Sequence, residues 1–161
     1  MPKASLKSRR AADGQTKAAL GDLAGCPFHD LRVRLAAAGL RATRQRMSLG
    51  WILFSRGARH LTAERLQEEA QESNVSISLA TIYNSLHQFT NAGLLCAIAV
   101  DGTRTYFDTN TVRHHHFLDD GVLIDIPELK VDVTSLPAPP AGKRIAEISV
   151  VVRLRDDSPA N

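Results

Sequence analysis

Several short helical segments followed by one hairpin signal limit the folds open to this 161-residue chain. Each of four amphipathic runs follows a residue that can cap a helix. The runs span residues 31–39, 44–55, 63–73 and 79–93, after Asp30, Thr43, Thr62 and Ser78. Two apolar runs then flank Asp101-Gly102, the preferred dipeptide of a two-residue hairpin turn. This order predicts a winged-helix domain, in which the last helix before the hairpin enters the DNA major groove.

Charge is divided unevenly along the chain. Residues 1–92 carry 13 Lys and Arg against 7 Asp and Glu, whereas residues 93–161 carry 7 against 10. The stretch from Leu31 to Arg59 holds seven arginines and no acidic residue. A solvated helix face usually mixes both signs, so this stretch indicates a polyanionic partner such as DNA. The alternative is an arginine-rich surface that binds nothing.

The run over residues 79–93 carries side chains suited to DNA contacts near its start. Ala80 and Thr81 can approach a thymine methyl group, and Asn84 can pair with adenine. The hydroxyl of Ser78 can hold a phosphate. Tyr83 is a further candidate, for which the alternative is a half-buried aromatic without a DNA contact.

Three arginines upstream are expected to support this contact. Arg41, Arg44 and Arg46 would lie along the DNA backbone or in a minor groove narrowed by A·T pairs. The chain contains no pattern typical of a nucleophile with its base, nor a phosphate-binding loop, so an enzyme is not predicted. Its two cysteines are too few for a disulfide framework. With no secretory signal and no apolar run of about 20 residues, a cytoplasmic protein without a membrane partner is expected.

The pattern changes to strands from about residue 111. The segments VLIDI and RIAEISVVVRLR read as strands, separated by the Pro/Gly-rich loop SLPAPPAGK. About 45 residues are too few to bury much core alone, so a homodimer is expected. The predicted fold class is α/β, with an N-terminal winged-helix DNA-binding domain followed by a small α/β dimerisation domain. The predicted divisions are a flexible basic arm (1–24), the winged helix (25–109), the dimerisation and sensing domain (110–155) and a frayed tail (156–161).

The run RHHHF places three of the six histidines side by side. Imidazole suits borderline transition metals and can also be an axial ligand of haem iron. His114, His115 and His116 are therefore predicted ligands. Neighbouring side chains in a strand point in alternating directions, so which of the three meets a metal stays open.

Three more residues offer donors of the right kind. His60 lies between two predicted helices, and Asp108 and Asp125 lie in or beside predicted strands. Their spacing alone does not show that they converge. A small zinc-dependent hydrolase is the alternative from another class of protein. It is disfavoured because adjacent histidines do not converge readily and no obvious carboxylate base lies beside them.

Five segments, read in order, carry a family resemblance: LAAAGLRATRQRMSLGWIL, RHLTAERL, ISLATIYNSLHQFTNAGLL, YFD and HHH. Over roughly residues 31–155 the chain resembles the ferric uptake regulator (Fur) superfamily. This resemblance implies a homodimeric, metal-responsive winged-helix transcription regulator. Tyr83 matches the tyrosine of the family's recognition helix, and Arg41 its basic residue before the second helix.

The same resemblance assigns a sensory site for Fe²⁺, Mn²⁺ or Zn²⁺ that links the two domains. The matching residues are His60, Asp108, one or more of His114, His115 and His116, and Asp125. Two features depart from the wider family. No C-x-x-C pair for structural zinc is present, and Ile148 stands where the family has a histidine in its last long strand.

These departures, together with GCPFHD over residues 25–30, resemble the iron response regulator subgroup. That subgroup implies control of iron and haem genes at an A·T-rich palindromic operator, with the protein released or degraded when it binds haem. The haem would be ferric or ferrous, and a haem-delivering protein is a possible partner. A Fur-type repressor that senses a divalent metal without haem is the alternative.

The expected haem ligands are Cys26 and His29 in this motif, with His114, His115 and His116. Pro27 restricts Cys26 to extended backbone conformations, and a thiolate is a strong axial ligand of ferric haem. The alternative is that Pro27 occupies the first turn of a helix and Cys26 is a passive neighbour of its cap.

Overall fold

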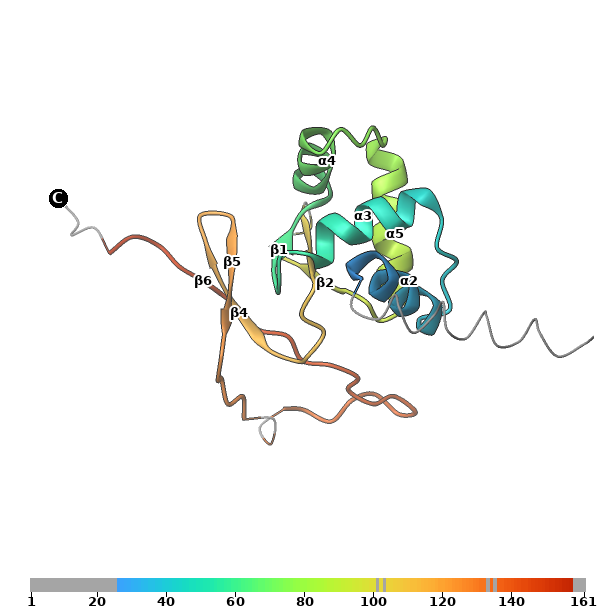
Figure 1. Ribbon diagram of the computed structural model, residues 1–161. Coiled ribbons are helices and arrows are strands. Elements are labelled where there is room, and N and C mark those ends of the chain that lie inside the picture. Colours follow the sequence, from blue (N-terminus) through green and yellow to red (C-terminus); the bar gives the residue numbers. More distant parts are fainter. Residues whose placement is uncertain (1–25, 101, 103, 133, 135, 158–161) are drawn as a thin grey trace, which may run out of the picture.

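The computed structural model describes residues 26–100, 102, 104–132, 134 and 136–157. The predicted arm over residues 1–24, Asp101 of the predicted turn and residues 158–161 of the predicted tail lie outside this range. The described helices gather on one side of the molecule, and strands β4 to β6 lie on the other (Figure 1). None of these helices combines the length and the apolar character needed to cross a membrane.

The helices are α2 (Pro27–Ala37), α3 (Arg44–Phe54), α4 (Ala63–Glu72) and α5 (Leu79–Asn91). The last three begin where their capping residues predict. The side chains of Thr43, Thr62 and Ser78 each accept a hydrogen bond of 3.3 Å from the backbone N–H three residues later. Each bond satisfies a donor that the helix leaves open at its N-terminus.

The start of α2 differs from the prediction. Cys26, not Asp30, is the N-cap, with an extended backbone (φ −76°, ψ 116°), and Pro27 occupies the first turn. Proline suits this position because its fixed φ fits a helix and its missing N–H would have no partner there. Asp30 lies within the first turn, and its N–H donates to the Cys26 carbonyl at 2.9 Å. The structure therefore agrees with the alternative in which Pro27 occupies the first turn of a helix and Cys26 lies at its cap.

The helices enclose one core and carry the first sheet at their edge. This sheet has the order β1 (His60–Leu61), β3 (Thr105–Asp108), β2 (Cys96–Ala99), with both pairs antiparallel. The predicted hairpin is confirmed, but its predicted two-residue turn is wrong. The ladder ends at Ala99 and Thr105, and Val100 donates to the Arg104 carbonyl beyond it.

The second described sheet has the order β5 (Val122–Ile126), β4 (His115–Asp119), β6 (Val151–Arg153). Strand β5 matches the predicted VLIDI strand, whereas the long strand predicted over residues 144–155 is reduced to β6. Strand β4 pairs antiparallel with β5 and parallel with β6. The β4–β5 turn is made by Asp120 and Gly121, both with positive φ, as in a two-residue hairpin.

A small apolar cluster holds the two sheets together. Ile98 and Tyr106 of the first sheet pack with Leu123 of the second, and the Tyr106 hydroxyl donates to the Gly121 carbonyl at 2.7 Å. The main core lies among the helices and reaches Phe107 of β3. Strand β3 therefore contacts both the main core and the small apolar cluster, and it lies where the two sheets meet.

Candidate metal centre

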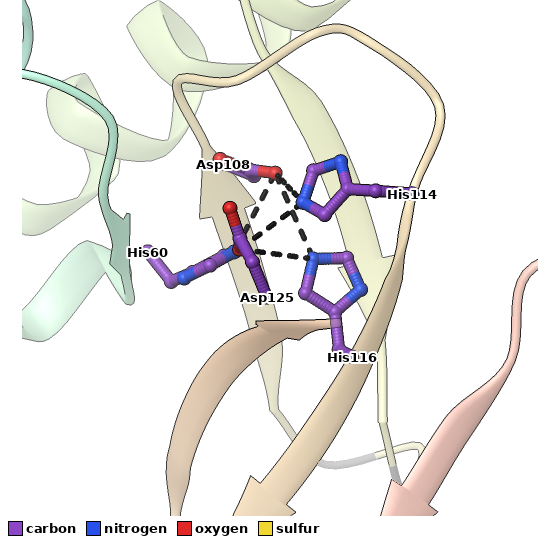
Figure 2. A group of neighbouring side chains, drawn as sticks. All are labelled: His60, Asp108, His114, His116 and Asp125. Atoms are coloured by element: carbon purple, nitrogen blue, oxygen red, sulfur yellow. Dashed lines mark hydrogen bonds and ion pairs between the residues drawn. The ribbon is translucent and has the colours of Figure 1, made fainter. Parts of the chain in front are cut away.

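Five side chains from four elements converge between the two sheets (Figure 2). Their potential ligand atoms all lie within 4.8 Å of one another. The residues, called the ligand cluster below, are His60 on β1, Asp108 at the end of β3, His114 just before β4, His116 on β4 and Asp125 on β5.

Strand pairing places these residues opposite one another. His60 is the cross-strand partner of Asp108, and His116 is that of Asp125. Directly opposed residues in a sheet carry their side chains on the same face, so each pair presents one imidazole with one carboxylate. The two pairs then face each other across the junction of the sheets.

His115 does not join this cluster. Because successive side chains in a strand alternate between faces, His114 and His116 turn toward the other sheet and His115 turns away. The Nδ1 atom of His115 instead accepts a hydrogen bond from the Val150 N–H at 3.3 Å. Of the predicted metal residues, the structure brings all except His115 together.

The carboxylate oxygens of Asp108 and Asp125 lie among the imidazole nitrogens. Asp125 Oδ1 lies 2.9 Å from His60 Nε2 and 3.1 Å from His114 Nε2. Asp108 Oδ2 lies 3.2 Å from His114 Nε2, 3.5 Å from His60 Nε2 and 3.7 Å from His116 Nε2.

These short distances do not amount to a satisfied network. Among the described residues, four buried atoms have no partner in hydrogen-bonding geometry: His60 Nε2, Asp108 Oδ2 and both ring nitrogens of His116. The side chains of Asp108 and His116 are only 1% and 3% exposed. Leaving such groups buried without a partner costs about 1–3 kcal/mol each. A bound cation would use the lone pairs of His60 Nε2, Asp108 Oδ2 and one ring nitrogen of His116, so the donor set fits a metal ion.

The electrostatics at Asp108 and His116 favour the protonation states that a metal requires. Burial would raise the pKa of the Asp108 carboxyl, but His60 and the Asn110 N–H outweigh burial and lower it. Burial, helped by the charges of His114 and His60, lowers the pKa of His116. Asp108 is therefore an anion and His116 a neutral imidazole at neutral pH, as ligation requires.

His114 is held in one tautomer. Its Nδ1 donates to the Val112 carbonyl at 2.6 Å, which leaves the lone pair of neutral His114 on Nε2, the atom that faces the cluster. Burial lowers the pKa of His114, but the Val112 carbonyl and the two carboxylates outweigh it, so the net shift is upward. In metal-binding histidines, the ring nitrogen that does not bind the metal typically donates a hydrogen bond in this way.

Cys96 lies beside the cluster but does not belong to it. It is the cross-strand partner of Asp108 on β2, and its thiol is free. Burial raises the pKa of the Cys96 thiol, and the charges of Asp108 and Glu147 raise it further. A protonated thiol is a poor ligand, so the centre offers imidazole and carboxylate donors without sulfur.

The predicted haem residues Cys26 and His29 lie elsewhere, at the start of α2 against α3. They are not part of the ligand cluster. Neighbouring Phe28 stacks on Trp51 with 4.4 Å between ring centroids, and it remains 53% exposed. The structure therefore does not join Cys26 to His114 and His116 in one pocket.

The predicted DNA contacts of α5 are accessible to different degrees. Ser78, Ala80 and Asn84 are exposed, whereas Thr81 and Tyr83 are half-buried. The Ser78 hydroxyl serves as the cap of α5 and lies 2.9 Å from the Thr81 hydroxyl. The Tyr83 hydroxyl donates to Glu64 of α4 at 2.8 Å, and this bond raises the pKa of Tyr83.

The predicted DNA-binding arginines also differ. Arg41 and Arg44 are exposed, but Arg46 is half-buried. Its guanidinium donates twice to the Gln88 side chain of α5, at 3.0 and 2.8 Å, and once to the Arg41 carbonyl at 2.8 Å. Arg46 therefore ties α3 to α5 in this structure.

One acidic residue neutralises part of the arginine-rich stretch. Glu69 of α4 is 3% exposed and pairs with Arg59, Arg56 and Arg65 at 2.5, 3.5 and 3.3 Å. Glu69 follows this stretch in the sequence, so the charges within residues 31–59 do not reveal the pairing. Two of the seven arginines in the stretch, Arg56 and Arg59, are therefore paired with Glu69.

Comparison with known proteins places this geometry in context. The model of the ferric uptake regulator family matches residues 37–132. The ferric uptake regulation protein of Pseudomonas fluorescens is 34% identical over 113 residues, which are 70% of this chain and 89% of that protein. The protein of the same name from Vibrio cholerae is 31% identical over 97 residues, 58% of this chain and 65% of that protein.

A solved structure agrees with these relatives. The structure of the ferric uptake regulator from Pseudomonas aeruginosa with manganese is similar with a TM-score of 0.62 at 25% sequence identity. The similarity covers 80% of this chain and 98% of that chain. It thus extends over both the helices and the second sheet, between which the ligand cluster lies.

Proposed function

Because the chain belongs to the ferric uptake regulator family, we propose that it is a transcription regulator whose DNA affinity is set by a bound divalent cation. His60, Asp108, His114, His116 and Asp125 would hold this cation. The observation that carries the proposal is the convergence of these donors around four buried atoms that have no hydrogen-bond partner among the described residues.

The donor set favours Mn²⁺ or Fe²⁺ over a structural zinc. Structural Zn²⁺ is almost always held by four ligands and is often bound by thiolates. Here three imidazoles and two carboxylates supply five or more donor atoms and no sulfur. Mixed nitrogen and oxygen ligands of this number suit Mn²⁺ and Fe²⁺. The bound cation would neutralise the two carboxylates and link β1 of the helical part to β4 and β5 of the second sheet.

The DNA-reading surface would be the start of α5, with Ser78, Ala80 and Asn84 exposed toward the major groove. Thr81 and Tyr83 would support it, and Arg41 and Arg44 would contact the backbone of an A·T-rich operator. Arg46 would act chiefly by holding α3 against α5 through Gln88.

A second copy of the chain would complete the protein. The face of the second sheet that points away from the cation carries exposed apolar side chains: Val122, Ile124, Val152 and Leu154. Exposed apolar surface of this kind is typical of an interface. A homodimer would cover this surface and present two α5 helices to the two halves of a palindrome.

The function is tested by measuring operator affinity with and without the cation. After chelation, Mn²⁺ is added to the dimer, and binding to an A·T-rich palindromic duplex is followed by gel shift at constant salt. A change in affinity of about 5–150-fold is expected, as is typical of coupled sites. An affinity that does not change between the chelated and the Mn²⁺-loaded protein would contradict the proposal.

Haem is a second candidate signal. It is supported by the free, partly exposed thiol of Cys26, which makes no side-chain cap hydrogen bond, with His29 in the first turn of α2. Haem would then attach at the start of α2, with the exposed Phe28 beside it, rather than at the cation site. In this case haem delivered to the protein would act through α2 and α3.

Cys26→Ala tests this candidate. If the Cys26 thiolate ligates ferric haem, the variant loses the thiolate signature from the absorption spectrum and binds haem more weakly. Cys96→Ala removes the other cysteine and is the matched control, with an unchanged spectrum. If both variants give the spectrum of the original protein, neither cysteine ligates haem, and attachment through Cys26 is contradicted.

A further inference from the structure

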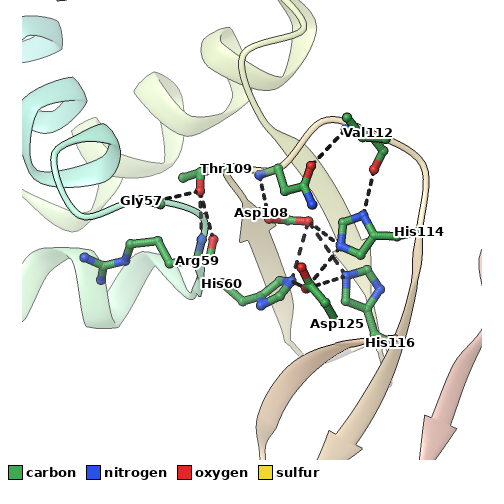
Figure 3. Close-up of polar contacts among 10 residues, drawn as sticks. Gly57, Arg59, His60, Asp108, Thr109, Val112, His114, His116 and Asp125 are labelled. Carbon is green, nitrogen blue, oxygen red and sulfur yellow. Dashed lines mark hydrogen bonds and ion pairs between the residues drawn. The ribbon is translucent and has the colours of Figure 1, made fainter. Parts of the chain in front are cut away.

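Thr109 joins the ligand cluster to the segment that leads into β1 (Figure 3). Its hydroxyl accepts a hydrogen bond from the Arg59 N–H at 2.9 Å, and its own N–H donates to the Arg59 carbonyl at 3.1 Å. The hydroxyl proton faces the carbonyl oxygens of Arg59 and Gly57 at 3.3 and 3.4 Å. One residue thus binds both backbone groups of Arg59.

These bonds fix the backbone of Arg59 and so set the direction of the chain at the next residue, His60. His60 is the residue after Arg59, and Asp108 is the residue before Thr109. The pair Arg59–Thr109 continues the register in which His60 opposes Asp108. The strand pairing here involves only two residues of β1, so the added side-chain bond of Thr109 matters for holding this short strand.

Arg59 extends the connection to the helices. Its guanidinium donates to Glu69 of α4, whose side chain is 3% exposed. Helix α4 in turn packs against α5, and its Glu64 accepts the hydrogen bond of Tyr83. A continuous series of contacts therefore runs from Asp108 through Thr109 and Arg59 to α4 and α5.

The residue after Thr109 orders the opposite side of the cluster. The Asn110 N–H donates to Asp108 Oδ1 at 2.7 Å, so Oδ2 is the oxygen that faces the histidines. The Asn110 side-chain oxygen accepts from the Val112 N–H at 3.2 Å, and the Val112 carbonyl accepts from His114. Asn110 holds the His114 side of the cluster, and Thr109 holds the His60 side.

We propose that Thr109 is a positioning residue whose hydroxyl sets His60 against Asp108 and couples the cation to α4 through Arg59. This inference rests on the proposed function, because it assigns a residue to the regulation of the same site. Residues that orient metal ligands typically change metal affinity by about 10–100-fold when replaced. The hydroxyl can be removed while the fold is kept, because valine has nearly the shape of threonine and its N–H can still donate to the Arg59 carbonyl.

The experiment compares Thr109→Val, which removes the hydroxyl, with Thr109→Ser, which retains it. Thr111→Val makes the same change at an exposed position two residues away and is the matched control. Mn²⁺ affinity is measured from the electron paramagnetic resonance signal of the free ion. Operator affinity is measured in the chelated protein and at saturating Mn²⁺, and the unfolding midpoint of each metal-free variant is recorded.

Thr109→Val is expected to bind Mn²⁺ about tenfold more weakly, and the gain in operator affinity at saturating Mn²⁺ should shrink several-fold. Its operator affinity without metal should stay unchanged, and Thr109→Ser and Thr111→Val should match the original protein. If Thr109→Val does not fold, Thr109→Ala carries the same expectation, because it also lacks the hydroxyl and has no bulk to clash.

Two outcomes overturn the inference while leaving the proposed function in place. One is an unchanged Mn²⁺ affinity and operator response in the variant without the hydroxyl. The other is an equal loss in Thr109→Ser, which would show that the hydroxyl is not the group responsible. If the original protein itself binds no Mn²⁺, the proposed function fails first, and the inference fails with it.

Discussion

His116→Leu is expected to abolish cation binding at micromolar Mn²⁺ and, at the same time, to stabilise the metal-free protein. Loss of a direct ligand should weaken Mn²⁺ binding by about 100-fold or more, at least as much as replacing a ligand's support. The buried His116 ring has two nitrogens without hydrogen-bond partners. Replacing such groups by an apolar side chain of similar size should raise the free energy of unfolding by about 1 kcal/mol.

His115→Leu is the matched control, because it makes the same change one residue earlier on the opposite face of β4. It should retain Mn²⁺ binding, since His115 lies outside the ligand cluster. Isothermal titration with Mn²⁺ and urea unfolding of the chelated proteins measure the two effects. A His116→Leu variant that binds Mn²⁺ as well as the His115→Leu variant would exclude His116 from the site.

Glu69→Gln is expected to lower the free energy of unfolding by about 2–3 kcal/mol at pH 7, measured by urea unfolding. The change removes the negative charge that Arg59, Arg56 and Arg65 surround. Breaking a fully buried pair costs about 3–5 kcal/mol. The smaller figure applies here because the Arg56 and Arg65 side chains are 58% and 52% exposed.

The effect of Glu69→Gln should depend on pH in a defined direction. Burial alone would raise the pKa of the Glu69 carboxyl, but the hydrogen bond from Arg59 and the charges of the three arginines outweigh burial and lower it below its usual value. A carboxyl whose pKa falls on folding stabilises the protein above its unfolded pKa, and this contribution disappears as pH falls through the folded pKa. The two proteins should therefore differ at pH 7 and converge in acid.

Glu68→Gln provides the comparison on the same helix. Its side chain is 61% exposed and pairs at 2.9 Å with Arg65. Exposed pairs contribute about 0–1 kcal/mol, so this variant should stay close to the original protein at every pH. Equal losses in the two variants would mean that Glu69 contributes no more than a surface charge.

The helical part of the fold could be predicted because its signals are local. A threonine or serine before an amphipathic run identifies the start of α3, α4 and α5 within a residue. The start of α2 is harder to predict, because Asp30 is the better capping residue and the Cys-Pro pair fits either a haem ligand or the start of a helix. The local backbone accounts for the Cys-Pro pair without a ligand.

The members of the ligand cluster could be expected from the sequence, but their arrangement in space could not. Residue types and family resemblance pointed to His60, Asp108, the histidine run and Asp125. The exclusion of His115 follows from strand alternation, which requires knowing that β4 starts at this residue. A local signal for that strand was present in Asp120-Gly121, which forms the β4–β5 turn.

Long-range partners could not be predicted from local patterns. Glu69 lies ten residues beyond Arg59, outside the arginine-rich stretch from Leu31 to Arg59. Asn110 and Val112 support their ligands through backbone groups, which carry no sequence signature. These contacts depend on the path of the chain rather than on the residue types.

Alternate residues of strand β4 face two different surroundings, the ligand cluster on one side and the exposed apolar face of the second sheet on the other. His116 and Leu118 point toward the cation cluster and the first sheet, whereas His115 and Phe117 point away, beside the exposed Ile124 and Val152. A strand has a side-chain period of two, so deleting or inserting one residue in it exchanges its faces. Such a change would turn His116 to the apolar outer face and bring His115 or Phe117 toward the first sheet. One shift would therefore disturb both the proposed cation site and the proposed surface for self-association.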